Sequence, residues 1–227
     1  MGIWSKASRT HVAHMTEGDF YGSEQSTVMK DKTSVRIELH PKNGEMKVLK
    51  DNVDLEAGEV IDASYMSIKH LRDFFADEIE DANATDILFS VHLKATMMKV
   101  SDPIIFGHCI RVFFKDVFDK HGAILDEIGA DPKQGLGSIL EVVQTKLEDR
   151  KKAKEIEADF KRCYGTEDRP WLAMVNSDKG ITNLHAPNDI IIDASMPVVI
   201  RDSGMMWNED GELEDCKCVS KFCCYIS

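Results

Sequence analysis

The sequence predicts an α/β protein with a mixed sheet, flanking helices and an early β-hairpin. Three observations predict this class. From residue 67 onward, strand-like apolar runs alternate with patterns of helical spacing. Nearer the start, an Asn-Gly pair divides two runs in which apolar and polar residues alternate. The 227 residues are 43% hydrophobic and 30% charged, as in a soluble globular protein.

The chain shows no internal repeat and no long low-complexity stretch. We expect one domain over residues 1–207, made of a turn-rich opening segment (1–30), a hairpin and strand region (31–66) and an α/β region (67–207). Residues 208–227 are expected to form a tail.

The hairpin is predicted at SVRIELHPKNGEMKVLK, residues 34–50, because Asn43-Gly44 favours a tight turn between two strands. Residues 59–66 predict a further strand. Ser67 is then typical of a helix N-cap, and the helix that it begins is expected to end near Ala82. Its apolar positions are Ile68, Leu71, Phe74, Phe75 and Ile79.

The second half of the chain continues the alternation of strands and helices. Residues 87–91 predict a buried strand, and a long helical pattern follows from Pro103 to about Ile128, with a break expected near Gly122. The remaining expectations are a loop at 129–137, a short helix at 138–147, a solvated helix at 148–162, strands at 171–178 and 189–200, and a helix opened by Pro197.

Charge and hydropathy exclude several classes of partner. The net charge of −12 argues against nucleic-acid binding and against docking on anionic membranes. The apolar runs are too short for a transmembrane helix, and the first residues lack the apolar core of a signal peptide. The chain begins Met-Gly, but Lys6 stands where a myristoylation signal has Ser or Thr.

Two cysteines, Cys109 and Cys163, stand alone in the chain. Isolated cysteines without a secretion signal indicate a reducing compartment. Four more crowd the last twelve residues, at positions 216, 218, 223 and 224.

Lys94 follows the predicted strand at 87–91 within a largely apolar run. An apolar setting lowers the pKa of a lysine, and sites in α/β folds gather where strands end. Lys94 is therefore a candidate general acid/base, or a group that neutralises a bound carboxylate. The alternative is a strand-edge lysine whose stem packs while its amine reaches water. Lys99 is interpreted as an ordinary loop lysine.

Asp189 and Asp193 flank an apolar triplet, and carboxylates in such a position are able to hold Mg²⁺ or Mn²⁺. The alternative is that they cap a strand and a turn. His11 and His14 lack the further ligands of a zinc site. No phosphate loop, dinucleotide fingerprint or nucleophile motif is present.

Five long strings nevertheless share one pattern: THVAHMTEGDFYGSE, GEVIDASYMS, SVHLKATMMKVSDPIIFGH, RPWLAMVNSDKGITNLHAPNDIIIDASMP and IRDSGMMW. Together they resemble the monomeric type of NADP-dependent isocitrate dehydrogenase, from about Trp4 to about Val219. The resemblance implies part of an isocitrate/isopropylmalate dehydrogenase-like large domain. It also implies oxidative decarboxylation of isocitrate to 2-oxoglutarate and CO₂, with NADP and Mg²⁺ or Mn²⁺.

Two site residues follow from the resemblance. The lysine of HLKAT implies that Lys94 contacts isocitrate and takes part in proton transfer. The aspartate of APND implies that Asp189 is a metal ligand. The family is monomeric, and a cytoplasmic location is expected, or a mitochondrial one if the source is eukaryotic.

The family's enzyme is a much longer chain than this one. Its other substrate ligands, a catalytic tyrosine, two further metal-binding aspartates and the NADP-contacting residues are expected outside residues 1–227. We therefore expect an internal portion that carries one face of the site, has no activity alone and self-associates through exposed apolar surface. The alternative is a non-catalytic fragment that acts as a structural or ligand-binding module.

The resemblance stops before SKFCCYIS, residues 220–227. Cys224 to Ser227 match the pattern of a farnesylation signal, with Cys223 beside it for a second lipid. The interpretation that we favour is a frameshifted or mis-spliced end.

Overall fold

The computed structural model describes residues 3–93, 100–163, 166, 168–176, 180–183, 200, 201, 203–207 and 212–220. The chain forms two compact units. The body comprises Met1–Asp19 and Ser67–Ser227, and the insert comprises Phe20–Met66. Lys94, Lys99, Asp189, Asp193 and the segment 189–199 lie outside the described residues.

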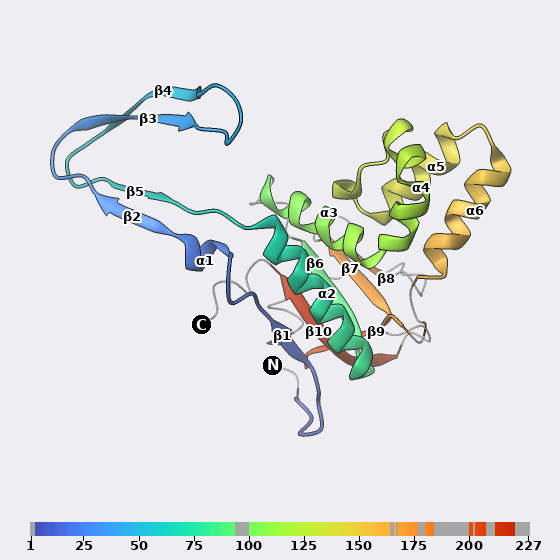
Figure 1. Ribbon diagram of the computed structural model, residues 1–227. Coiled ribbons are helices and arrows are strands. Elements are labelled where there is room, and N and C mark those ends of the chain that lie inside the picture. Colours follow the sequence, from blue (N-terminus) through green and yellow to red (C-terminus); the bar gives the residue numbers. More distant parts are fainter. Residues whose placement is uncertain are drawn as a thin grey trace. The chain divides into compact units, whose positions relative to one another are not determined.

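The body contains a mixed sheet with the strand order β1-β10-β6-β7-β8, and β9 pairs with β10 (Figure 1). β1, β10, β6 and β7 run parallel, whereas β8 and β9 are antiparallel to their neighbours. The predicted mixed α/β class is thus confirmed. The strand bounds are His11–Ala13 (β1), Leu88–Leu93 (β6), Leu172–Asn176 (β7), Gly180–Asn183 (β8), Met205–Trp207 (β9) and Leu213–Ser220 (β10).

β10 lies inside the sheet, between β1 and β6, although residues 208–227 were expected to form a tail outside the domain. Cys216 and Cys218 share one face of this strand, where their Sγ atoms are 3.4 Å apart in a buried apolar cluster with Leu88 and Met206. No strand was predicted here, because Glu214 and Asp215 precede the cysteines, Lys217 separates them, and such residues have low strand propensity. Burial in the middle of the sheet overrides that weak propensity.

Lys217 points to the opposite face of β10 and is almost completely buried. Its Nζ atom lies 2.5 Å from Glu78 Oε2 and also contacts Asp81, and both acids belong to helix α2, Ile68–Ala84. The ammonium lowers the pKa of Asp81, first through this hydrogen bond and then through its charge. The ion pair therefore connects the central strand to the helix that covers it.

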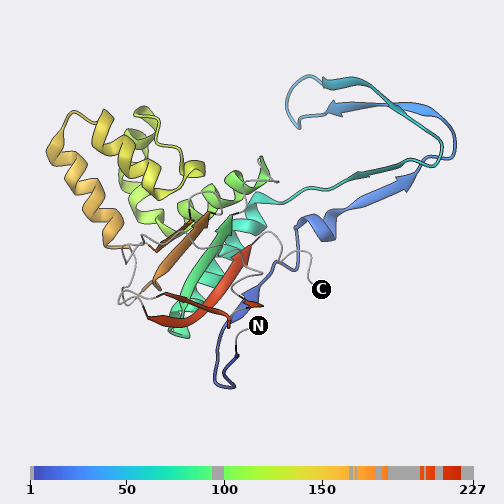
Figure 2. The same ribbon diagram turned by 180° about the vertical axis from the view of Figure 1, so that it is seen from behind.

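The predicted helix after Ser67 is confirmed as α2, Ile68–Ala84, whose N-cap Ser67 accepts a hydrogen bond from the His70 N–H. It lies beside α3, Ser101–Phe113, and both helices contact β6 (Figure 2). The buried side of α2 consists of Leu71, Phe75, Ile79 and Ala82, which follow helical spacing.

The long helix predicted from Pro103 to Ile128 is two helices, and the break expected at Gly122 was wrong. α3 ends at Phe113 and α4, Lys115–Glu127, begins after Phe114. Phe113 and Phe114 are both buried. The centroid of the Phe114 ring lies 5.0 Å from that of Phe113 and 5.1 Å from that of Phe160. The turn at Phe114 lets the two rings contact different elements, since Phe113 stacks on Phe89 of β6 and Phe114 contacts Phe160.

The remaining helices are α5, Leu136–Lys146, and α6, Arg150–Lys161. The segment predicted as a loop contains a short 3₁₀ helix, Pro132–Gln134, which Asp131 caps. α6 is charged, as expected, but Ile156 and Phe160 contribute fully buried side chains to the core.

The insert contains two separate two-stranded ribbons and the short helix α1, Phe20–Ser23. The predicted hairpin is confirmed as β3, Thr33–Leu39, paired with β4, Lys47–Leu55. Residues 40–46 connect the two strands, so the loop is longer than a two-residue Asn-Gly turn. The predicted strand at 59–66 is β5, Val60–Ala63, and it pairs with β2, Gln25–Val28.

The Lys217 ion pair predicts an asymmetry between two kinds of variant. We expect Glu78→Gln with Asp81→Asn to lower the free energy of unfolding by about 3 kcal/mol, because it leaves a buried ammonium without a counter-charge. Lys217→Met should stay within about 1 kcal/mol of the wild type, since it removes the buried charge itself. Urea denaturation followed by circular dichroism measures both. Equal losses in the two variants would contradict this account.

Candidate functional site

The candidate site is the edge of the body where its parallel strands end. The register pairs Ala13 with Val219, Ser220 with His92, and Leu93 with Asn176. β1, β10, β6 and β7 therefore end within about one residue of each other at one edge. In α/β sheets, ligands bind at the carboxyl ends of the strands, where loops and helix N-termini meet.

Two helices begin at the same edge. Only Thr85, Asp86 and Ile87 separate α2 from β6, so α2 runs antiparallel to that strand and starts where the strand ends. Figures 1 and 2 show the beginnings of α2 and α3 next to each other there. The Ser67 N–H donates to the Gly18 carbonyl oxygen over 2.7 Å, which joins the segment after β1 to the start of α2. Helix N-termini carry partial positive charge and favour anionic ligands.

Two buried carboxylates belong to the segments that meet at this edge. Asp102 lies in the first turn of α3 and Asp19 follows β1, and they are 5% and 4% exposed. Both make polar interactions within the protein. Asp102 is also 3.5 Å from the Ser101 hydroxyl. An acid in the first turn of a helix is stabilised by the helix dipole.

The sequence position of Lys94 fits this edge, because β6 ends at Leu93. The strand ends two residues later than expected, at Leu93 rather than at Val91. Lys94 and Asp189 themselves lie outside the described residues, so their roles stay predictions. His11 lies on β1 with its Nε2 atom 3.9 Å from an Asp81 carboxylate oxygen. The His14 ring meets the Met15 carbonyl oxygen over 3.2 Å.

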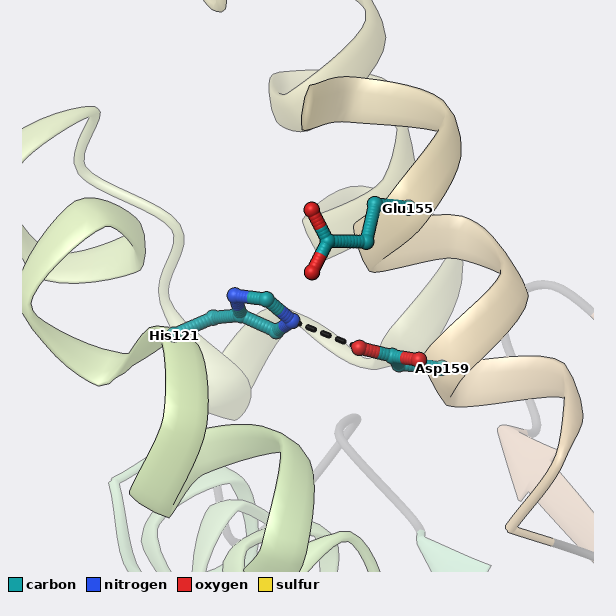
Figure 3. Close-up of side chains that lie close together, drawn as sticks. All are labelled: His121, Glu155 and Asp159. Carbon is teal, nitrogen blue, oxygen red and sulfur yellow. Dashed lines mark hydrogen bonds and ion pairs between the residues drawn. The ribbon is translucent and has the colours of Figure 1, made fainter. Parts of the chain in front are cut away.

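Sequence reasoning missed a buried histidine–carboxylate cluster between α4 and α6 (Figure 3). His121 Nε2 lies 2.7 Å from Asp159 Oδ2, and Glu155 stands one turn before Asp159 on α6. Ligand atoms of the three residues lie within 4.8 Å of one another. The signal was the spacing of Glu155 and Asp159, four residues apart, in a helix that was interpreted as solvated.

The charges around this cluster do not suit a metal ion. Lys120 Nζ lies 2.8 Å from Glu155 Oε1 and 2.8 Å from Asp159 Oδ2. Lys152 lies 3.0 Å from Glu155, and Arg162 contacts Asp159. Two carboxylates thus already face three cations, and a divalent ion would have to displace the Lys120 ammonium. We interpret the cluster as an ion-pair network that connects α4 to α6.

The network shifts two pKa values. Hydrogen bonds from Lys120 and Lys152 lower the pKa of Glu155 to about 2. Burial, with the nearby Lys152 and Lys120 charges, lowers the pKa of His121. A neutral His121 donating its Nε2–H to Asp159 is the consistent arrangement, and the tautomer is inferred from this contact.

A cleft of about 440 Å³ adjoins the network, between α4, α6 and the segment leading to β7. Its arginines are already paired: Arg169 lies 2.6 Å from Asp116, and Arg162 contacts Asp159. The arginines and Lys120 that line the cleft are therefore already neutralised and are not available to an anionic ligand. It also lies toward the start of β7, away from the edge where the strands end.

Comparison with known proteins adds a family. The profile of the family "Monomeric isocitrate dehydrogenase" matches residues 1–227. The chain is 54% identical over 225 residues to the isocitrate dehydrogenase [NADP] of Azotobacter vinelandii, which covers 99% of this chain and 30% of that protein.

Two further relatives are isocitrate dehydrogenase [NADP] 2 of Colwellia maris and of Mycobacterium tuberculosis. They are 54% and 48% identical over 217 and 220 residues, which cover 96% and 97% of this chain and 29% of each relative. The chain thus spans slightly under a third of the length of the curated relatives that it matches.

The ion-pair network predicts a pH dependence of stability. Because the folded-state pKa of Glu155 is lowered from 4.5 to about 2, its contribution is present above pH 4.5 and is lost as the pH falls toward 2. We expect Glu155→Gln to lower the urea midpoint of unfolding at neutral pH. Acidification to about pH 3 should then lower the midpoint of this variant by less than it lowers that of the wild type. Glu157→Gln is the matched control on α6, since Glu157 has no ion pair among the described residues. An unchanged acid response in Glu155→Gln would contradict the assignment.

Proposed function

The chain belongs to the monomeric isocitrate dehydrogenase family, and from this premise we propose that it is part of an NADP-dependent isocitrate dehydrogenase. The match over all 227 residues carries the proposal, supported by relatives named isocitrate dehydrogenase [NADP]. The reaction is oxidation of isocitrate to 2-oxoglutarate and CO₂. Because the chain spans about 30% of its relatives, the activity is proposed for the longer protein, to which this chain contributes one face of the site.

We propose Lys94 as the residue of this chain that acts on the substrate. It directly follows β6, whose end lies beside the ends of β7 and β10. The starts of α2 and α3 lie at the same edge, and their partial positive charge suits a tricarboxylate. An ammonium in this position neutralises a substrate carboxylate and exchanges a proton with the reacting oxygen or carbon.

Asp189 is the metal ligand that we propose, and the substrates are isocitrate and 2-oxoglutarate. When bound, Mg²⁺ or Mn²⁺ withdraws electrons from the substrate oxygens, and NADP accepts the hydride. A single carboxylate is a poor site for Mg²⁺, so further ligands must come from the longer protein and the substrate. The α4–α6 network is not assigned this role, because three cations surround its carboxylates.

A cytoplasmic location is also proposed. The four cysteines that the structure describes are free thiols, as expected in a reducing compartment. Within the described residues, no helix is both long enough and apolar enough to cross a membrane.

The isolated 227-residue chain should not form NADPH from isocitrate and should bind Mn²⁺ only weakly. The reason is that its site lacks most of the expected ligands. NADPH absorbance and calorimetric titration with Mn²⁺ measure the two properties. Robust turnover by the isolated chain would overturn the proposal that this chain holds only one face of the site.

Site roles are tested by placing this chain in the Azotobacter vinelandii enzyme, in place of the segment that it matches. If the chimera turns over, Lys94→Met should lower kcat by about 10²–10⁴-fold, because a proton-transfer group is lost. Asp189→Asn should raise the Mn²⁺ concentration needed for half-maximal rate by about tenfold or more.

Matched controls lie close by in the sequence. Lys99→Met and Asp193→Asn remove the same charges from the same two segments and should leave kcat and the Mn²⁺ requirement near those of the parent chimera. An inactive parent chimera would favour the alternative, in which this chain is a non-catalytic module. Equal losses in Lys94→Met and Lys99→Met would remove the case for Lys94.

A further inference from the structure

The Asn43-Gly44 pair, which predicted a tight hairpin turn, lies instead in an open loop of the insert. The pairing of β3 with β4 ends at Leu39 and Lys47, and residues 40–46 connect the two strands (Figure 1). In a two-residue hairpin turn, the hydrogen bonds of the flanking strands hold both turn residues in place. Here other loop residues separate the Asn-Gly pair from the strands on both sides, so strand pairing does not restrain it.

Both residues of the pair are exposed to solvent. Across the described part of the chain, neither the Gly44 N–H nor the Asn43 carboxamide has a hydrogen-bonding partner in the protein. Gly44 has a φ of 133°, a backbone angle that residues with a Cβ rarely adopt. The missing Cβ also leaves the Gly44 nitrogen open to approach by its neighbour. The side chain of Asn43 and the backbone nitrogen of Gly44 are therefore free to meet.

An asparagine followed by glycine places a nucleophile close to an electrophile. Attack of the Gly44 backbone nitrogen on Asn43 Cγ closes a five-membered imide. The Cγ–Nδ2 bond breaks, and Nδ2 leaves as ammonia with the proton that the Gly44 nitrogen loses. Water then opens the imide at either of its two carbonyl carbons, which gives an aspartate or an isoaspartate at this position. The sum converts an amide and water to a carboxylate and ammonium, so no oxidant or reductant is required.

A second asparagine of the insert lacks this combination of features. Asn43 is the only asparagine of the sequence that is followed by glycine. Asn52 is also exposed, but Val53 follows it within β4 and pairs with Val35. A β-branched side chain hinders approach to its own backbone nitrogen, and strand pairing fixes the backbone. The Asn52 amide also donates to Asp54 over 2.8 Å. The insert thus offers a matched comparison for Asn43.

We propose that Asn43 is a site of spontaneous deamidation in this chain, through an imide closed by the Gly44 nitrogen. The product adds one carboxylate to a chain whose net charge is already −12. The isoaspartate form also routes the backbone through the former side chain and lengthens the loop by one methylene. Because the loop lies beyond the pair of Leu39 and Lys47, both products are compatible with the β3–β4 register. The proposal depends only on the insert and does not rest on the proposed dehydrogenase function.

Incubation of the folded 227-residue chain at mildly alkaline pH tests the proposal. Peptide mass spectrometry should show that the peptide containing Asn43 gains the mass difference between an amide and an acid, in two forms that chromatography separates. Conversion should be slower at neutral pH, because the attacking nitrogen must lose its proton. An isoaspartyl methyltransferase should label the isoaspartate form of this peptide, whereas the peptide containing Asn52 should keep its amide.

Two variants provide the test and its matched control. Asn43→Gln keeps an amide in the loop, but attack on it would have to close a six-membered ring, so the methyl label of this peptide should be lost. Asn52→Gln makes the same change in β4 of the same insert and should keep the label at Asn43. Circular dichroism checks that both variants are folded as the wild type is.

A synthetic peptide of residues 40–46 measures the reaction without the fold. If Asn43 kept its amide in the folded chain while the synthetic peptide converted, the proposal would be overturned, because the loop would then hold the pair apart. Conversion at Asn52 as extensive as that at Asn43 would also overturn it, since the open loop and the glycine would then make no difference.

Discussion

The structure depends on β10 occupying the space between β1 and β6. This parallel pairing joins residues 11–13 to residues 217–219, which lie about two hundred positions apart in the sequence. Lys217 connects the strand to α2 on one face, and Cys216 and Cys218 fill the apolar cluster on the other. Without β10, β1 would have no partner and the sheet would end at β6.

The parallel arrangement also creates the candidate site. The loops that follow parallel strands all leave the sheet at one edge. The short connection between α2 and β6 places the start of α2 at the same edge. Asp19, which follows β1, and Asp102, in the first turn of α3, belong to segments that begin at this edge. The roles proposed for Lys94 and for an anionic substrate rest on the end of β6 at Leu93 and on the family match.

Two parts of the molecule depart from the simple rule of an apolar interior and a polar surface. Between α4 and α6, acids buried or partly buried are retained because Lys120, Lys152 and Arg162 neutralise them. In the insert, apolar side chains stay exposed because two ribbons without a covering helix have no interior. The first departure stabilises the body from within, whereas the second leaves apolar area of the insert exposed in this chain.

The sequence by itself determined the α/β class and the α2 helix with its Ser67 cap, because local periodicity and capping decide these features. The tertiary structure alone decided the break at Phe114, the central place of β10 and the His121–Asp159 contact. Each of these depends on which distant residues share a core, and local periodicity does not contain that information. Burial in the sheet thus converted a polar, cysteine-rich segment into the strand that holds the body together.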